Sequence, residues 1–110
     1  MKACIFPNDP IIAYLEKGEI KERYFNPNNI FDEIHIISFI DKDVEIEKVQ
    51  KIVGTAKIII HSVGKINIKN KKTEILKILK IVRKINPDII RTYNSLIQGW
   101  CAAYIANELN

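Results

Sequence analysis

The sequence predicts an α/β domain with a parallel sheet of about four strands and helices on both faces. Three observations predict it. Short apolar segments alternate with helical patterns, those segments are apolar almost throughout, and the resulting order is β-α-β-α-β-α-β-α. Strands covered on both faces lack the alternation of half-exposed strands. Right-handed crossovers between such strands produce a parallel sheet with helices on both faces.

The first strand and the first helix are predicted within residues 2–17. An apolar run over residues 2–6 indicates a buried strand. Asp9 precedes a helical pattern over residues 10–17, and we expect it to cap that helix because aspartate accepts from free N–H groups. Gly18 can adopt the left-handed conformation that ends a helix, so the helix is predicted to stop there.

The second strand follows an irregular connection. Turn-forming residues and aromatic residues at positions 24–29 predict an ordered connection, with a brief strand near residues 21–25. Residues 33–39 then predict the second strand, which ends at a charged turn. Residues 45–53 predict a short helix that Gly54 ends.

The third strand, predicted at residues 56–61, leads through a basic loop at 63–71 into the clearest helix of the sequence. Over residues 72–85, aliphatic side chains recur on one face while lysine and arginine occupy the other. Such a basic face is typical of a solvated surface. It is also typical of a helix lying on an anionic membrane, so peripheral membrane contact through residues 72–85 stays open.

The fourth strand is predicted at residues 88–93, and a last helix begins near Asn94 or Ser95 and continues to Leu109. The element expected next is another central strand. Without it, a strand suited to the centre of the sheet would form an exposed edge. We therefore expect residues 1–110 to be a single domain that is truncated.

Composition and charge exclude several classes of protein. Hydrophobic residues make up 47% of the chain and charged residues 27%, as in globular domains. The net charge of +4 is mild and arginine is scarce, so we expect no nucleic-acid partner. Cys4 and Cys101 stand alone, which predicts buried thiols and no metal site. With no signal peptide and no apolar run of membrane-spanning length, we expect a cytoplasmic protein.

The sequence lacks the familiar phosphate-binding motifs. It contains no GxxxxGK[ST], and no GxGxxG follows the first strand. The third strand ends at His61 and Ser62, where a phosphoacceptor domain would carry a carboxylate. A histidine at a strand end commonly just hydrogen-bonds backbone, and we expect His61 to do so. His35, within the second strand, is predicted to be structural.

The candidate site lies in the loops after the strands, because open α/β sheets bind ligands at their carboxyl ends. Asn8 follows the first strand, and Tyr93, Asn94 and Ser95 follow the fourth. Amides hydrogen-bond hydroxyl groups and aromatic rings cover the apolar faces of sugars, so this set suits a carbohydrate. The alternative is that Asn94 and Ser95 only cap the last helix.

Several segments resemble family-4 type glycosyltransferases. The beginning of such enzymes is similar to residues 10–20 (PIIAYLEKGEI), 23–27 (RYFNP) and 31–36 (FDEIHI). Their fourth strand and following helix are similar to residues 87–94 (PDIIRTYN), then Gly99-Trp100 and Ala102-Ala103. The resemblance runs over nearly the whole chain, and the order and spacing of the segments carry it.

The resemblance implies the GT-B fold, in which two Rossmann-like domains face each other across a cleft. Residues 1–110 would be the incomplete half of the N-terminal, acceptor-side domain. The implied reaction transfers a sugar, with retention, from a nucleotide-sugar donor to a hydroxyl of a sugar or lipid-linked acceptor. It implies no cofactor and no obligatory metal, and a role in polysaccharide or glycolipid biosynthesis.

The resemblance also implies that the chain does not act alone. The C-terminal domain that grips the nucleotide-sugar and the family's usual N-terminal histidine would both lie beyond Asn110. We therefore expect this fragment to be inactive by itself, with Asn8, Tyr93, Asn94 and Ser95 shaping the acceptor side of the cleft.

An alternative from a different class is a stand-alone, non-catalytic α/β module for binding or assembly. Such a module would dock a partner through the open edge of its sheet. A stand-alone four-stranded domain should then cover that edge by forming a dimer.

Overall fold

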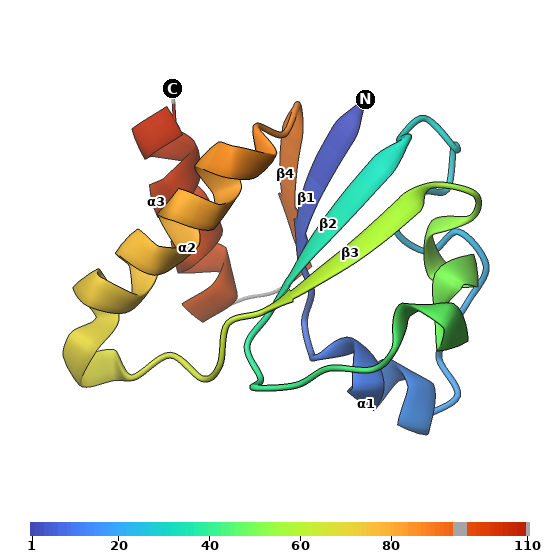
Figure 1. Cartoon of the computed structure of the whole chain (residues 1–110), viewed down its shortest axis with the longest axis horizontal. Helices are drawn as coiled ribbons and strands as arrows, with labels where there is room; N and C mark the ends of the chain where they lie inside the picture. The colour runs from blue at the N-terminus through green and yellow to red at the C-terminus, as the bar shows by residue number, and fades with distance from the viewer. Residues whose placement is uncertain (94–96, 110) are drawn as a thin grey trace.

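The computed structural model describes residues 1–93 and 97–109, with only the backbone for residues 68 and 97–100. Its four strands form one sheet in the order β3-β2-β1-β4, with every neighbouring pair parallel. Helices cover both faces (Figure 1), which confirms the predicted α/β, Rossmann-like fold. The elements are β1 (Lys2–Phe6), α1 (Ile11–Glu16), β2 (Glu33–Ser38), η1 (Ile46–Lys48), η2 (Gln50–Val53), β3 (Lys57–Ser62), η3 (Ile68–Asn70), α2 (Lys71–Ile85), β4 (Ile89–Thr92) and α3 (Ile97–Leu109).

The register of the sheet brings the carboxyl ends of the strands to one edge. Phe6 lies opposite Thr92 across β1 and β4, and Ser38 lies opposite Ser62 across β2 and β3. The loops that follow the strands therefore gather on that edge, where parallel sheets carry their ligand sites.

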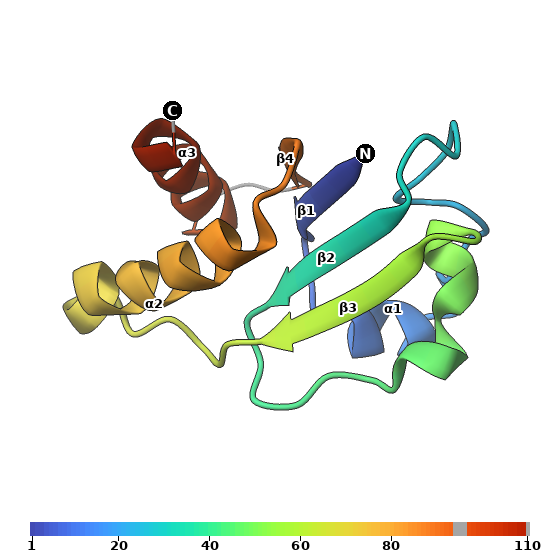
Figure 2. The same ribbon diagram turned by 45° about the horizontal axis from the view of Figure 1, so that its top comes forward.

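The sheet separates two hydrophobic cores. In β1, Ala3 and Ile5 face the first core while Cys4 and Phe6 face the second, so all four are buried. The first core lies against α1, η1 and η2, and the second lies against α2 and α3 (Figure 2). Because β1 is covered on both faces, its sequence is apolar without alternation.

The brief strand expected near residues 21–25 is absent from the structure. These residues form turns instead, and their backbone is tied to η2, since the N–H groups of Arg23 and Phe25 donate to the carbonyls of Lys51 and Ile52. The buried amide of Asn26 holds the end of this turn. Its Nδ2 donates to the carbonyls of Phe31 and Val53, and its Oδ1 accepts from Phe31 N–H. Side-chain hydrogen bonds thus replace the ladder of a strand.

The short helix expected over residues 45–53 is also different. It forms two 3-10 helices, η1 and η2, that meet at Val49. Val49 leaves helical geometry, with φ −129° and ψ 9°, and its side chain is fully buried in the first core. Burial of Val49 in the first core is therefore favoured over a continuous helix through residues 45–53. Gly54 ends η2 as predicted, in the left-handed region with φ +68°.

The two cysteines are free and buried in the second core, as predicted. Among the described residues, no helix is both long enough and apolar enough to cross a membrane.

Candidate functional site

A hollow of about 300 Å³ lies at the carboxyl edge of the sheet, between β4 and the segment that contains α1. It brings together two of the residues predicted from the sequence, Asn8 and Tyr93. The other two, Asn94 and Ser95, lie outside the described residues. The hollow is lined by Asn8, Asp9, Tyr14, Lys17, Glu19, Lys21, Tyr24 and Tyr93.

Three tyrosines form one wall of the hollow and pack on the buried ring of Phe25. The Phe25 ring centroid lies 5.0 Å from that of Tyr93, 5.1 Å from that of Tyr24 and 6.1 Å from that of Tyr14. The rings of Tyr24 and Tyr93 are 5.7 Å apart. Tyr24 is 41% exposed, so its ring is open to a ligand while its neighbours fix it.

Sequence reasoning missed Tyr14 and Tyr24 as members of this site. Tyr14 lies in α1 and Tyr24 in the irregular connection, so neither follows a strand directly. The only sequence signal was the pair of aromatics among the turn residues at 24–25. This signal points to the site only once the fold is known, because the fold places the turn beside the end of β4.

The polar groups of the hollow are arranged around those rings. Lys17 Nζ lies 3.6 Å from Asp9 Oδ2, and the Asn8 side-chain amide donates to the same oxygen over 3.4 Å. Burial raises the pKa of Tyr14, although a backbone hydrogen bond from Asn8 acts against the rise. Tyr14 therefore stays a neutral phenol at pH 7 and can donate a hydrogen bond. Amides, phenols and a carboxylate beside exposed rings are groups that bind a hydroxyl-rich ring.

The amino end of α1 carries its own anion. The carboxylate of Asp43, in the loop after β2, accepts from Ile11 N–H over 2.9 Å and Ile12 N–H over 2.7 Å. The same side chain accepts from Val44 N–H over 2.7 Å and from Ser38 Oγ over 2.5 Å. The expectation that Asp9 caps α1 is therefore wrong. The loop after β2 folds back over α1 and brings a carboxylate to its free N–H groups.

Asp43 decides what this edge of the sheet can bind. In dinucleotide-binding domains, the N–H groups at the start of the first helix hold a phosphate. Here a built-in carboxylate takes those N–H groups, and a phosphate would meet like charge. The N–H groups of Ile11 and Ile12 are therefore not available to a phosphate.

The two histidines lie away from the hollow. The strand order places β2 and β1 between β3, which carries His61, and β4, beside which the hollow lies. His61 Nε2 lies 2.9 Å from His35 Nδ1, so its partner is a side chain, and the expected backbone-bonding role is not what the structure shows. His35 is buried within the sheet, in keeping with a structural residue. No cluster of three or more potential metal ligands occurs in the part of the chain that is described.

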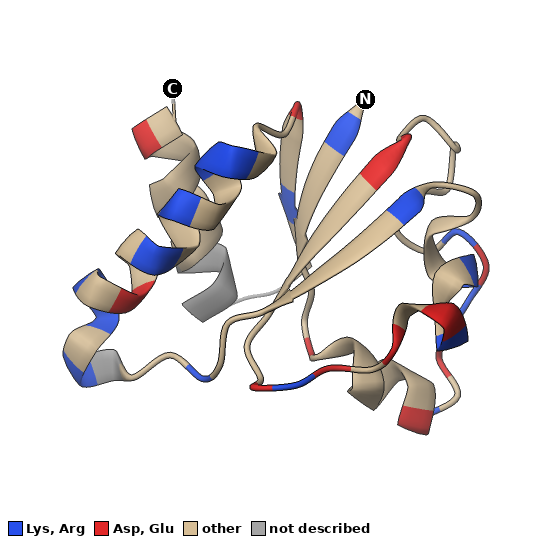
Figure 3. Ribbon diagram, in the orientation of Figure 1, with Lys and Arg blue, Asp and Glu red and all other residues tan. Residues whose placement is uncertain are grey.

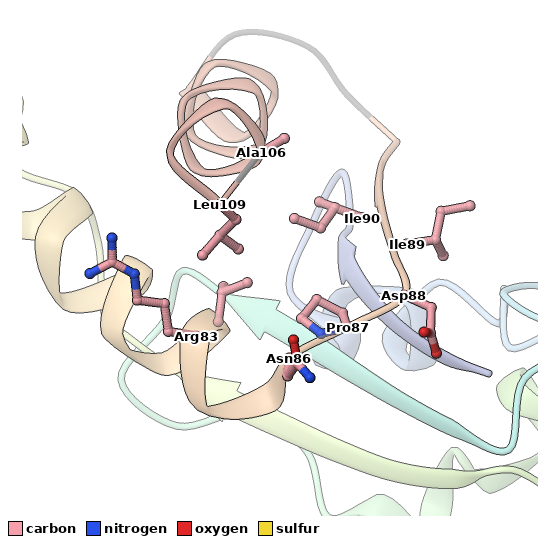
Figure 4. Close-up of a pocket in the computed structure, with 9 residues that line it drawn as sticks. Arg83, Asn86, Pro87, Asp88, Ile89, Ile90, Ala106 and Leu109 are labelled. Carbon is pink, nitrogen blue, oxygen red and sulfur yellow. The ribbon is translucent and has the colours of Figure 1, made fainter.

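A second hollow, of about 430 Å³, lies at the opposite edge, where β4 begins. Figure 4 shows Ile90 of β4 and Leu109 of α3 pointing into it, with Arg83 and Asp88 at its rim. This hollow contains none of the predicted site residues. Its lining combines aliphatic side chains with the polar groups of Arg83, Asn86 and Asp88, and it lies beside the edge strand β4.

In comparisons with protein-family models, curated proteins and solved structures, the chain matches none.

Replacing Asp43 with alanine should destabilise the protein by about 2 kcal/mol, because the first N–H groups of α1 and the Ser38 hydroxyl lose their acceptor. Asp41→Ala, in the same loop at an exposed position, should change stability by less than about 0.5 kcal/mol. Urea unfolding of both variants measures the difference. Equal losses would show that Asp43 does not hold this edge together.

Proposed function

We propose that this chain is the acceptor-side part of a glycosyltransferase, which binds a sugar or the sugar of a lipid-linked acceptor in the tyrosine-lined hollow. The observation that carries the proposal is the convergence of Asn8 and Tyr93 with two further tyrosines at the carboxyl edge of the sheet. Stacked rings cover the apolar face of a sugar, while amide and carboxylate groups orient its hydroxyls.

The occupied N-terminus of α1 beside the hollow supports an acceptor site over a donor site. A nucleotide-sugar carries a diphosphate, which needs cations or unoccupied N–H groups. Asp43 occupies those groups at α1, and the charges of Lys17 and Lys21 in the hollow are matched by those of Asp9 and Glu19. The donor would therefore be gripped by a second domain facing this edge, as the resemblance implies.

In the proposed reaction, an acceptor hydroxyl oxygen bonds to the anomeric carbon of the donor sugar. The bond between that carbon and the diphosphate oxygen breaks, and the diphosphate leaves with the electron pair. The acceptor proton passes to a base or to the departing diphosphate. The tyrosine-lined hollow would contribute by holding the acceptor in the orientation for attack.

Tyr24→Ala should weaken binding of a simple disaccharide such as maltose about tenfold, because it removes the most exposed ring of the hollow. Tyr104→Ala, a matched change at an exposed tyrosine in α3, should leave binding unchanged. Saturation-transfer NMR on the sugar protons measures both affinities. Equal binding by the two variants would remove the hollow from the proposed function.

One observation favours the non-catalytic module as a second candidate. β4 is an edge strand among the described residues, and the hollow of Figure 4 lies directly beside it. A second copy of the chain could extend the sheet at this edge and fill that hollow. Under this alternative the tyrosine-lined hollow binds no sugar, so the sugar measurement separates the two functions.

We further propose that α2 rests on an anionic membrane surface, where a lipid-linked acceptor would be found. Figure 3 shows lysine and arginine along the length of α2. Leu76 is 52% exposed and lies on the same helical face as Lys80 and Lys84, one and two turns further on. An apolar side chain among cations is the pattern of a helix that lies in the membrane interface.

The double change Lys80→Gln and Lys84→Gln should weaken binding to vesicles containing phosphatidylserine about thirtyfold at low salt, at ~1 kcal/mol for each cation. The same neutralisation of Lys48 and Lys51, exposed in η1 and η2, should have little effect. Vesicle sedimentation at two salt concentrations provides the measurement. Binding that ignores salt, or that is equal on neutral vesicles, would contradict the membrane contact.

A further inference from the structure

Three titratable side chains form a continuous chain of hydrogen bonds from β2 to β3. His35 Nε2 lies 2.8 Å from Glu33 Oε2, and His35 Nδ1 lies 2.9 Å from His61 Nε2. The two imidazole rings lie edge to edge and nearly in one plane, with centroids 5.2 Å apart and planes inclined by 15°. These contacts join β2 to β3, which is an edge strand among the described residues.

The contacts fix where the protons lie. The hydrogen bond with His35 lowers the pKa of Glu33, so this carboxylate is ionised at neutral pH and accepts from His35 Nε2–H. A neutral imidazole carries one N–H, which leaves His35 Nδ1 as an acceptor. His61 must therefore donate its Nε2–H to His35, and its own Nδ1 remains free to take a proton.

The cluster can hold one added proton and no more. One added proton leaves every hydrogen bond in place, whether it lies on His61 Nδ1 or on His35 Nδ1, because in the second case His61 carries its own proton on Nδ1 and accepts from His35 through Nε2. A second added proton places N–H groups on both His35 Nδ1 and His61 Nε2, which face each other at 2.9 Å, and the contact between the strands then has to break.

We infer that Glu33, His35 and His61 form a proton-sensitive clamp that fastens the edge strand β3 to β2 and loosens in mild acid. The device is independent of the sugar site, which lies beyond β1 at β4. No bound metal is needed to explain it, because each nitrogen that the clamp uses has a partner in the cluster.

The other charged groups around the clamp do not replace its partners. Lys2 of β1 lies 3.6 Å from Glu33 and also donates to the carbonyl of Ile85, and Lys57 of β3 acts on Glu33 at longer range. Cys4, opposite His35 in β1, remains a neutral thiol because burial raises its pKa to about 12. The lysines of α2, which packs on this face, are exposed: Lys71, Lys72, Lys77, Lys80 and Lys84.

The direction of the pH effect follows from His61. Burial and the neighbouring His35 lower its pKa below the ordinary value of 6.5. Between 6.5 and that lowered pKa, the unfolded chain binds more protons than the folded one, so stability falls as the pH falls. Glu33 adds a second loss at lower pH, as the pH passes through its own lowered pKa.

Two measurements on the whole chain test the clamp. In a ¹⁵N titration of the histidine side chains, His61 should become doubly protonated only below the ordinary pKa of 6.5. Amide hydrogen exchange of Ile59, Ile60 and His61, corrected for intrinsic rates, should speed up severalfold between pH 7.5 and pH 5.

The variant His61→Gln is the matched control, since its amide can still donate to His35 Nδ1 but does not titrate. Its β3 amides should exchange at nearly the same corrected rate at both pH values. A His61 side chain that titrates at the ordinary pKa of 6.5 would overturn the clamp. A His61→Gln protein with the pH dependence of the wild type would overturn it as well. The wild-type titration decides the question even if the variant fails to fold.

Discussion

The carboxylate of Asp43 connects three parts of the chain that meet at the carboxyl edge of the sheet. It follows β2, bonds the hydroxyl at the end of that strand and holds the first N–H groups of α1. The position of α1 sets that of Tyr14, and Tyr14 packs with Phe25 under the rings of the hollow. The same carboxylate removes the position at which related folds bind phosphate. One side chain therefore both builds the candidate site and restricts its ligands.

Sequence reasoning located the parts of the fold that depend on repeating patterns. The apolar runs identified all four strands to within two residues, and the two-faced pattern of α2 identified that helix, because burial on fixed faces leaves a periodic signal. Sequence reasoning failed where contacts between residues far apart in the sequence determine the local structure. Val49 breaks a helix by packing into the core, and Asp43 caps a helix some 30 residues before it. Asn8 and Tyr93 were chosen because each follows a strand, and they line one hollow because β1 and β4 are neighbours in the sheet. Their contact with a ligand stays a prediction.

The sheet supports two separate kinds of chemistry at its opposite edges. At β4, aromatic rings and neutral polar groups line an open hollow, and the proposed ligand is a sugar. At β3, a carboxylate and two imidazoles hydrogen-bond one another, and the proposed ligand is a proton. Because β2 and β1 lie between them, either assignment can fail without affecting the other.

The central claim is that the carboxyl edge binds a neutral sugar and does not bind a diphosphate. Its most direct test is a pair of ¹H–¹⁵N NMR titrations of the unmodified chain, one with a disaccharide and one with uridine diphosphate. The account predicts that the disaccharide shifts the amides of Asn8, Lys17 and Tyr24, while the nucleotide leaves those of Ile11 and Ile12 unchanged. Shifts at Ile11 and Ile12 with the nucleotide, and none with the disaccharide, would contradict it.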